Sequence, residues 1–124
     1  MFDDLLTAHA RIDQWESDLA DRLARANALV GRITELRTTA RDRDGLVEVS
    51  VDANGVPIDL WLSEGVRHWS AAQIAREILA TMRKAHAQLA AQVAEAAREV
   101  YGPDSTAATT IAARVRERFG LGED

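Results

Sequence analysis

Nine of the ten basic side chains between residues 22 and 84 are the groups in this sequence best suited to a chemical role. Guanidinium and ammonium groups in such number bind phosphate oxygens, and on a duplex they would contact the backbone rather than the bases. Arg25 and Arg32 are one heptad apart, so they share a helix face. The nine are Arg22, Arg25, Arg32, Arg37, Arg41, Arg43, Arg76, Arg83 and Lys84.

The distribution of charge offers a competing explanation for these residues. The formal net charge is −5, which argues against indiscriminate binding to polyanions. Residues 1–21 hold six acids and one arginine, whereas residues 22–43 hold six arginines and two acids. Acids at the start and bases at the end of one helix also suit the helix dipole. Both explanations of the arginines therefore stay open at this point.

Chemistry of the enzymatic kind is not indicated. The chain lacks cysteine, its three histidines are scattered, and it contains no phosphate-binding, zinc-protease or nucleophile-elbow motif. Glu48, Asp52 and Asp59 would share the outer face of a sheet, where acids are usually solvated or protect an edge. We therefore expect no catalytic residue, metal, cofactor or small-molecule substrate.

Length and hydropathy place the chain among small cytoplasmic proteins. It has 124 residues, enough for one domain with a modest core. No apolar run approaches the roughly 18 residues of a membrane span. The opening residues are acidic and polar, unlike a secretory signal, so we expect neither membrane association nor export.

The elements that must position the arginines begin with a long helix over about residues 3–37. Its apolar residues follow the heptad spacing of a coiled-coil seam, interrupted by Arg22. Members of the seam are Leu5, Ala8, Ile12, Trp15, Leu19, Ala26, Leu29, Ile33 and Leu36. Residues 38 and 39 are predicted to begin a short strand.

The stretch VEVSVDANGVPIDLWL predicts a β-hairpin with a type I′ turn at Asn54-Gly55. This turn sets Val51 opposite Ile58, Val49 opposite Leu60 and Val47 opposite Leu62, all on one apolar face. Trp61 falls on the other face, where an exposed aromatic side chain suits a subunit contact.

Two further helices are predicted. One begins at Ser70, with Gln73 completing a capping box and Trp69 and Ile74 forming a hydrophobic staple, and it runs to about Tyr101. Gly102-Pro103 ends it, and a third helix spans about residues 105–119. The docking site of this third helix does not follow from the sequence.

These elements predict an α+β fold with two layers, a short antiparallel sheet of two or three strands and helices against it. Strands of six to eight residues span roughly 20–27 Å, whereas helices of about 30 residues span roughly 45 Å. The helices must overhang the sheet, so we expect a homodimer. Its expected sheet contacts are Val47, Val49, Val51, Ile58, Leu60, Trp61 and Leu62.

The sequence resembles the YbaB/EbfC nucleoid-associated family over about residues 3–100. The resemblance lies in a long first helix, the stretch GLVEVSVDANG, a second strand that ends IDLWL, and an alanine-rich helix. This resemblance implies a homodimer joined through its sheets, with projecting helices. It also implies binding to double-stranded DNA with little sequence specificity. Residues 1–102 would form the family domain and residues 103–124 a C-terminal helical extension.

The tryptophans and the extension are similar to actinobacterial members, some of which are encoded with type VII secretion systems. The alternative function is accordingly a non-enzymatic, chaperone-like dimer that binds a protein partner and not DNA. Its binding surface would be the seam around Trp15 together with the third helix.

Overall fold

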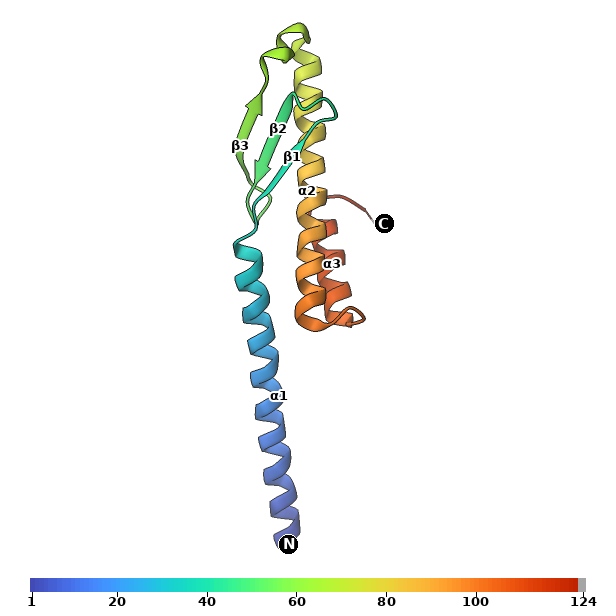
Figure 1. Ribbon diagram of the computed structural model, residues 1–124. Coiled ribbons are helices and arrows are strands. Elements are labelled where there is room, and N and C mark those ends of the chain that lie inside the picture. The colour runs from blue at the N-terminus through green and yellow to red at the C-terminus, as the bar shows by residue number, and fades with distance from the viewer. Residues whose placement is uncertain (123–124) are drawn as a thin grey trace.

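The computed structural model describes residues 1–122, which form three α-helices, one three-stranded sheet and a short 3-10 helix (Figure 1). In chain order they are α1 (Phe2–Thr34), β1 (Thr38–Arg41), β2 (Val47–Val51), β3 (Pro57–Leu62), the 3-10 helix (Glu64–His68), α2 (Ala71–Tyr101) and α3 (Thr106–Arg118). The predicted α+β class is confirmed. Among residues 1–122, no helix combines the length and hydropathy needed to cross a bilayer.

The sheet is antiparallel in the order β1-β2-β3, and α2 covers one of its faces. Val47, Val49 and Val51 alternate along β2 and are fully buried against α2, where they meet Ala85 and Leu89. Burying a valine or leucine side chain contributes about 1.5–3 kcal/mol, so each buried valine and leucine of this cluster adds substantially to the stability of the fold. A hydrogen bond of 2.6 Å from Thr38 Oγ1 to Gln92 Oε1 also ties β1 to α2.

The predicted type I′ turn is wrong. Gly55 has φ +80°, but none of the described non-glycine residues has a positive φ, so Asn54 cannot occupy the first position of such a turn. The Gly55 N–H donates to the Asp52 carbonyl at 2.9 Å, as in a three-residue loop whose last residue is left-handed. The Asp52 carboxylate favours this three-residue loop over a two-residue turn, because it accepts hydrogen bonds from the N–H groups of Asn54 and Val56.

The longer loop also corrects part of the predicted register. Val47 lies opposite Leu62 and Val49 opposite Leu60 as predicted, but Val51 lies opposite Pro57 and not Ile58. The irregularity falls between Ser50 and Val51, and it leaves Ile58 as an extra residue in β3. Two of the three predicted pairs are therefore confirmed, and the third is displaced by one residue.

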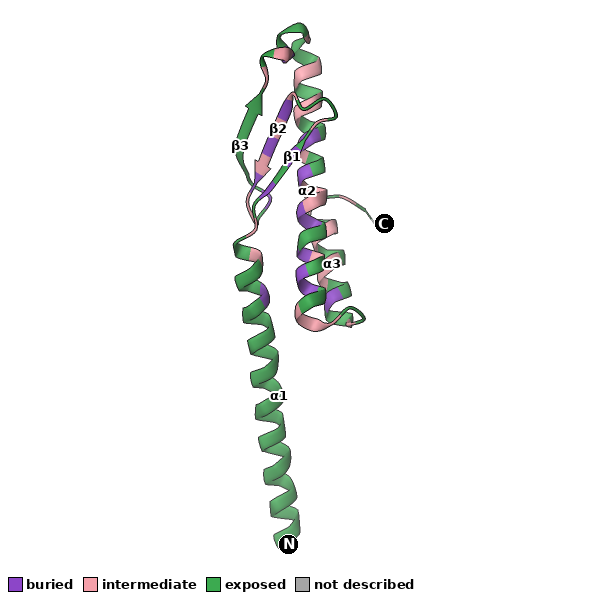
Figure 2. Cartoon of the chain, viewed as in Figure 1, coloured by how far each residue is buried: buried purple, intermediate pink, exposed green. Residues whose placement is uncertain are grey.

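Strand β3 lies at the uncovered edge of the sheet, and each of its six residues is exposed (Figure 2). Leu60 and Leu62 lie opposite buried valines of β2, yet α2 passes beneath β1 and β2 and does not reach them. Trp61 lies opposite Glu48 on the other face and is about half exposed. The sheet therefore presents apolar side chains to solvent on both faces of its last strand.

The predicted start of α2 is confirmed. Ser70 is the N-cap, and its Oγ accepts a hydrogen bond of 3.1 Å from the Gln73 N–H. Trp69 and Ile74 both pack against the core. Helix α1 ends at Thr34, three residues before the prediction, and the strand expected from Thr38 is β1. The 3-10 helix was not predicted.

Helix α3 packs along α2 and reaches the tip of the β2–β3 hairpin. The Phe119 ring stacks on His86 with centroids 4.5 Å apart, and a hydrogen bond of 2.8 Å joins His86 Nε2 to the Gly55 carbonyl oxygen. The guanidinium of Arg118 donates to the Asn54 carbonyl oxygen. We call these contacts the hairpin latch, and they give the docking site that the sequence left open.

Among residues 1–122, helix α1 packs against other elements near its C-terminal end. Leu29 is its one buried residue among those described, and Arg32 forms an ion pair with Glu99 of α2. The 33 residues of α1 span about 50 Å, so most of the helix projects beyond α2 (Figures 1 and 2). We call residues 2–26 the arm.

Candidate nucleic-acid interface

The structure separates the nine basic residues into three groups. Arg22, Arg25 and Arg32 lie on α1, and the last of these is tied to Glu99. Arg37 precedes β1, while Arg41 ends β1 and Arg43 follows it. The third group, on α2, consists of Arg76, Arg83 and Lys84. All nine residues are exposed, as contact with a phosphate backbone requires.

Three of the nine come together where the end of β1 meets α2. Arg41, Arg43 and Lys84 line one shallow hollow of about 170 Å³, which the acids Asp42 and Glu77 also line. Lys84 Nζ donates a hydrogen bond of 2.7 Å to the Arg41 carbonyl oxygen, which places its ammonium group beside the strand. Arg83 is adjacent to Lys84 in sequence. Arg76 precedes Arg83 by one heptad, so these two arginines share a face of α2. We call Arg41, Arg43, Arg83 and Lys84 the basic shoulder.

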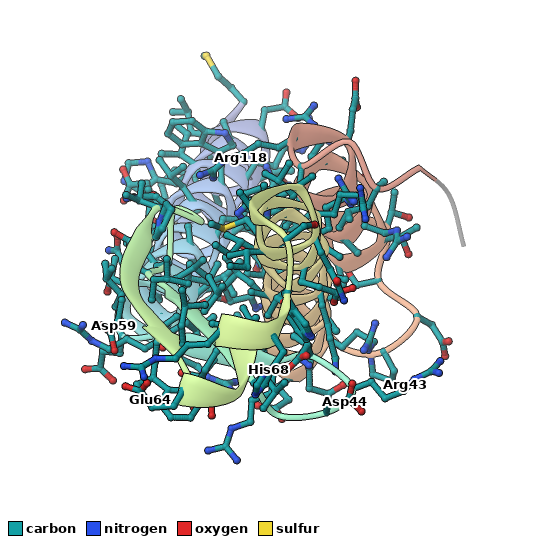
Figure 3. The ribbon with its side chains drawn as sticks, turned by 90° about the horizontal axis from the view of Figure 1, so that it is seen from above. Arg43, Asp44, Asp59, Glu64, His68 and Arg118 are labelled. Atoms are coloured by element: carbon teal, nitrogen blue, oxygen red, sulfur yellow. The ribbon has the colours of Figure 1, made fainter. Side chains whose placement is uncertain are left out.

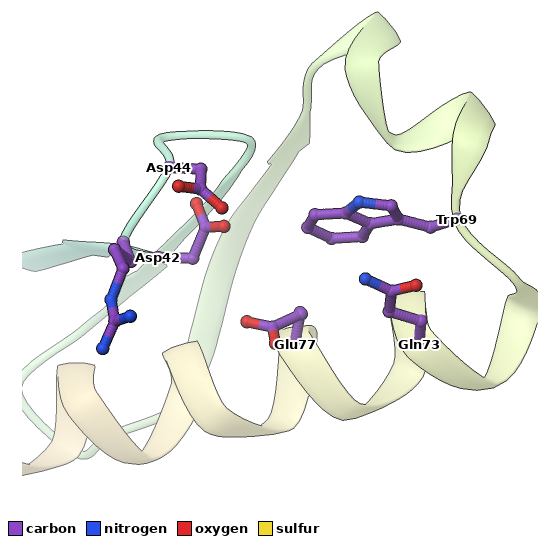
Figure 4. A pocket seen from close by; sticks show the side chains of 6 residues that line it. Asp42, Asp44, Trp69, Gln73 and Glu77 are labelled. Atoms are coloured by element: carbon purple, nitrogen blue, oxygen red, sulfur yellow. The ribbon is translucent and has the colours of Figure 1, made fainter.

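Carboxylates lie close to the basic shoulder and limit its field. Arg41 Nε is 3.3 Å from Glu48 Oε2, in the pair that the β1–β2 register sets opposite each other. A second hollow, of about 390 Å³, adjoins Arg43 and is lined by Asp42, Asp44, Trp69, Gln73 and Glu77 (Figure 4). Asp42 is engaged locally, because its Oδ1 accepts a hydrogen bond of 2.9 Å from the Val47 N–H.

The view from above shows where several charged side chains lie on the two sides of the molecule (Figure 3). Arg43 and Asp44 lie together on the loop side, whereas Asp59 and Glu64 lie on the side of β3. A polyanion would therefore meet mixed charge on the loop side, while on the β3 side Glu64 is paired with Arg67 and Asp59 is exposed.

Two of the three acids considered for catalysis, Glu48 and Asp52, have structural partners. Glu48 pairs with Arg41, and Asp52 accepts two backbone N–H groups in the hairpin turn. Within residues 1–122, no group of three or more histidine, aspartate or glutamate side chains is placed to hold a metal ion. The arrangement of the described residues offers charge and hydrogen bonds, and we find no constellation suited to bond making.

Sequence reasoning missed the acidic partners that form ion pairs with two of the nine basic residues. Glu99 is far from Arg32 in the chain, and no local pattern connects the two. The pairing of Arg41 with Glu48 could have been found only by assuming the β1–β2 register. Arg118, which fastens α3 to the hairpin, was also missed, because the docking of α3 was unknown.

Comparison with known proteins agrees with this architecture. The model of the family described as the YbaB/EbfC DNA-binding family matches residues 12–103, most of the chain. This span runs from the arm through the sheet to the end of α2, and α3 lies beyond it. No match was found among curated proteins or among solved structures.

Proposed function

Because the chain belongs to the YbaB/EbfC DNA-binding family, we propose that it is a nucleoid-associated homodimer that binds double-stranded DNA with little sequence specificity. Family membership supports the DNA-binding role. The exposed cations, described above, support phosphate as the group that is contacted. We assign no catalytic step, cofactor or metal to this protein.

The exposure of the cationic side chains in the basic shoulder is the observation that carries this proposal. Among the described residues, no carboxylate lies within ion-pair distance of Arg43, Arg76 or Arg83, so these guanidinium groups remain able to bind an anion. Lys84 donates to a carbonyl group, which leaves its charge uncompensated. Contacts of this kind carry no sequence information, because every nucleotide presents the same phosphate.

The nine basic residues are unequal as candidates. We place the basic shoulder and Arg76 first, Arg37 next, and Arg22 and Arg25 on the arm after them. Arg32 comes last, because Glu99 already neutralises it. We further propose that residues 103–124 are an extension added to the DNA-binding domain of residues 1–102; α3 lies within the described part of that extension.

The direct test is an electrophoretic mobility shift on several unrelated duplexes at about 50 and 200 mM salt. Affinity should be nearly the same for each duplex and should fall steeply with salt, because bound counterions are released on association. A dimer that makes 6–10 phosphate contacts should lose roughly 10³–10⁵ in affinity over this range. The absence of any shift at 50 mM would refute DNA binding.

The exposed strand β3 supports the homodimer. Leu60 and Leu62 are apolar, solvent-exposed and aligned with the core face, and an unpaired edge strand is a template for association. A second copy that brings its own β3 to the same place would cover these residues. Trp61 on the opposite face would become part of the same contact.

Leu60→Asp should convert the dimer into a monomer, because a charge in the subunit contact would be buried without a partner. Sedimentation velocity at micromolar concentration should give about twice the chain mass for the wild type and the chain mass for the variant. Leu79→Asp is the matched control, since Leu79 is similarly exposed on α2 but lies away from β3. Equal masses for both variants would show that β3 is not the interface.

A protein-binding role without DNA is the second candidate, and the arm favours it. Leu5, Ile12 and Trp15 are more than half exposed along one seam, which a monomer in solution would leave uncovered. A chaperone-like dimer, such as one associated with type VII secretion, would use such a surface. No shift at low salt, together with the stable complex of one defined protein, would favour this candidate over DNA binding.

A further inference from the structure

The arm is an amphipathic helix that lacks a partner among residues 1–122 of its own chain. Its seam continues the line of Leu29, which is buried against α2. Beyond the end of α2 the same seam is open, with Leu5, Ile12, Trp15 and Leu19 between 41 and 65% exposed. The heptad spacing therefore extends over a length that only another helix can cover.

The charges beside the seam indicate which helix this is. In heptad terms, the positions that flank the seam on one side are Asp4, Arg11, Asp18 and Arg25, which alternate in sign. His9, Glu16 and Leu23 flank the other side. Flanking charges of this type set the partner and the orientation of a coiled coil.

An antiparallel pair of arms matches these charges. When Ile12 is set against the partner's Trp15, Arg11 falls opposite the partner's Asp18, and Asp4 falls opposite the partner's Arg25. On the other flank, His9 falls opposite the partner's Glu16. Twofold symmetry repeats each pair, so no like charges face each other along this overlap.

The central core layers of the same register are apolar on both helices. Ala8 meets the partner's Leu19, and Ile12 meets the partner's Trp15. Arg22 interrupts the seam, and here it faces the partner's Leu5 near the end of the overlap, where its guanidinium can reach water. From Leu29 onward, each helix is already covered by its own α2.

Other registers and orientations are less compatible with the sequence. A shift of one heptad in one direction sets Arg11 against the partner's Arg11. A shift in the other direction sets Asp18 against the partner's Asp18. A parallel pair would place the two Arg22 side chains side by side within the seam. Like charges directly opposed are destabilising, so these arrangements are disfavoured.

We propose that the arm is a self-association surface, on which the arms of two copies pair antiparallel with Arg11 opposite the partner's Asp18. This contact is separate from β3. A protein dimerised through β3 has two arms to offer, so pairing of arms links dimers to one another. The inference does not depend on DNA binding.

A charge swap tests both the pairing and its orientation. Arg11→Asp alone and Asp18→Arg alone should each lower the association constant by about 10-fold, because each puts like charges opposite each other twice. The combined Arg11→Asp, Asp18→Arg variant should restore wild-type association. A parallel pair would not be restored, because there Arg11 faces Glu16 and Asp18 faces Leu23. Asp13→Arg, on the outer face of the arm, is the control and should change nothing.

Sedimentation velocity over a 100-fold rise in protein concentration, roughly from 1 to 100 μM, is the measurement, with circular dichroism to confirm unchanged helix content. The wild type should gain mass by a further association step, whether that step begins from a monomer or from a dimer. Failure of the wild type to gain mass, or failure of the combined variant to recover, would overturn the proposal. Mobility shifts on the same variants should match the wild type, which separates this result from failure of the DNA-binding proposal.

Discussion

Replacing Arg43, Arg83 and Lys84 together with glutamine is expected to weaken DNA binding at about 50 mM salt by at least 100-fold. Each cation that no longer neutralises a phosphate makes the slope of log affinity against log salt concentration shallower by about 0.9. Three such cations should therefore change the slope by about 2.7 for each subunit that contacts the duplex, and by about 5.4 when both subunits do. Fluorescence anisotropy of a labelled duplex over a series of salt concentrations gives both the affinity and the slope.

The control is a second triple variant with the same net charge. Arg67, Arg98 and Arg114 are exposed, lie outside the nine candidates, and would be replaced with glutamine in the same way. Two of them already pair with Glu64 and Glu95 within one helical turn. If both variants lose affinity equally, the protein responds to total charge, and the basic shoulder is not a binding surface.

Replacing Gly55 with valine is expected to lower the free energy of unfolding by about 3–5 kcal/mol. The residue has φ +80°, a conformation that β-branched side chains resist. A Cβ atom at this position would also lie 2.7 Å from Phe119 Cζ, so the ring would have to leave its place against His86. Urea denaturation followed by circular dichroism measures the loss.

Gly45→Val separates these two causes. Gly45 has φ +72°, but a Cβ atom there would have no neighbour within 4 Å, so this variant should lose only about 1–2 kcal/mol. In a Phe119→Ala background, the additional cost of Gly55→Val should largely disappear. Equal losses for the two glycine variants would mean that the hairpin latch contributes nothing at this position.

The local signals of the sequence predicted most of the fold. The start of α2 depends on Ser70, Gln73 and their immediate neighbours, and the structure confirms it. The position of the hairpin was equally local, since alternating valines before Asn54-Gly55 and alternating apolar residues after it leave little choice. The turn type was wrong because the Asp52 side chain competes for the backbone N–H groups of the loop, which the dipeptide rule ignores.

The site was less predictable, because it depends on residues that are distant in sequence. Identifying candidate arginines requires only composition and heptad spacing. Deciding which of them are neutralised requires the pairing of Arg32 with Glu99 and of Arg41 with Glu48. Predicting the hollow shared by Arg41, Arg43 and Lys84 likewise requires knowing that the end of β1 lies on α2.

The hairpin latch has a consequence for the order in which the chain acquires its structure during synthesis. Asn54 and its donor Arg118 are 64 residues apart. At roughly 5–20 residues per second, the ribosome needs several seconds to make the intervening chain. During this interval α3 does not yet exist, and the turn depends on the local bonds of the Asp52 carboxylate. The nascent hairpin therefore has its own means of persisting until the helix that fastens it has been translated.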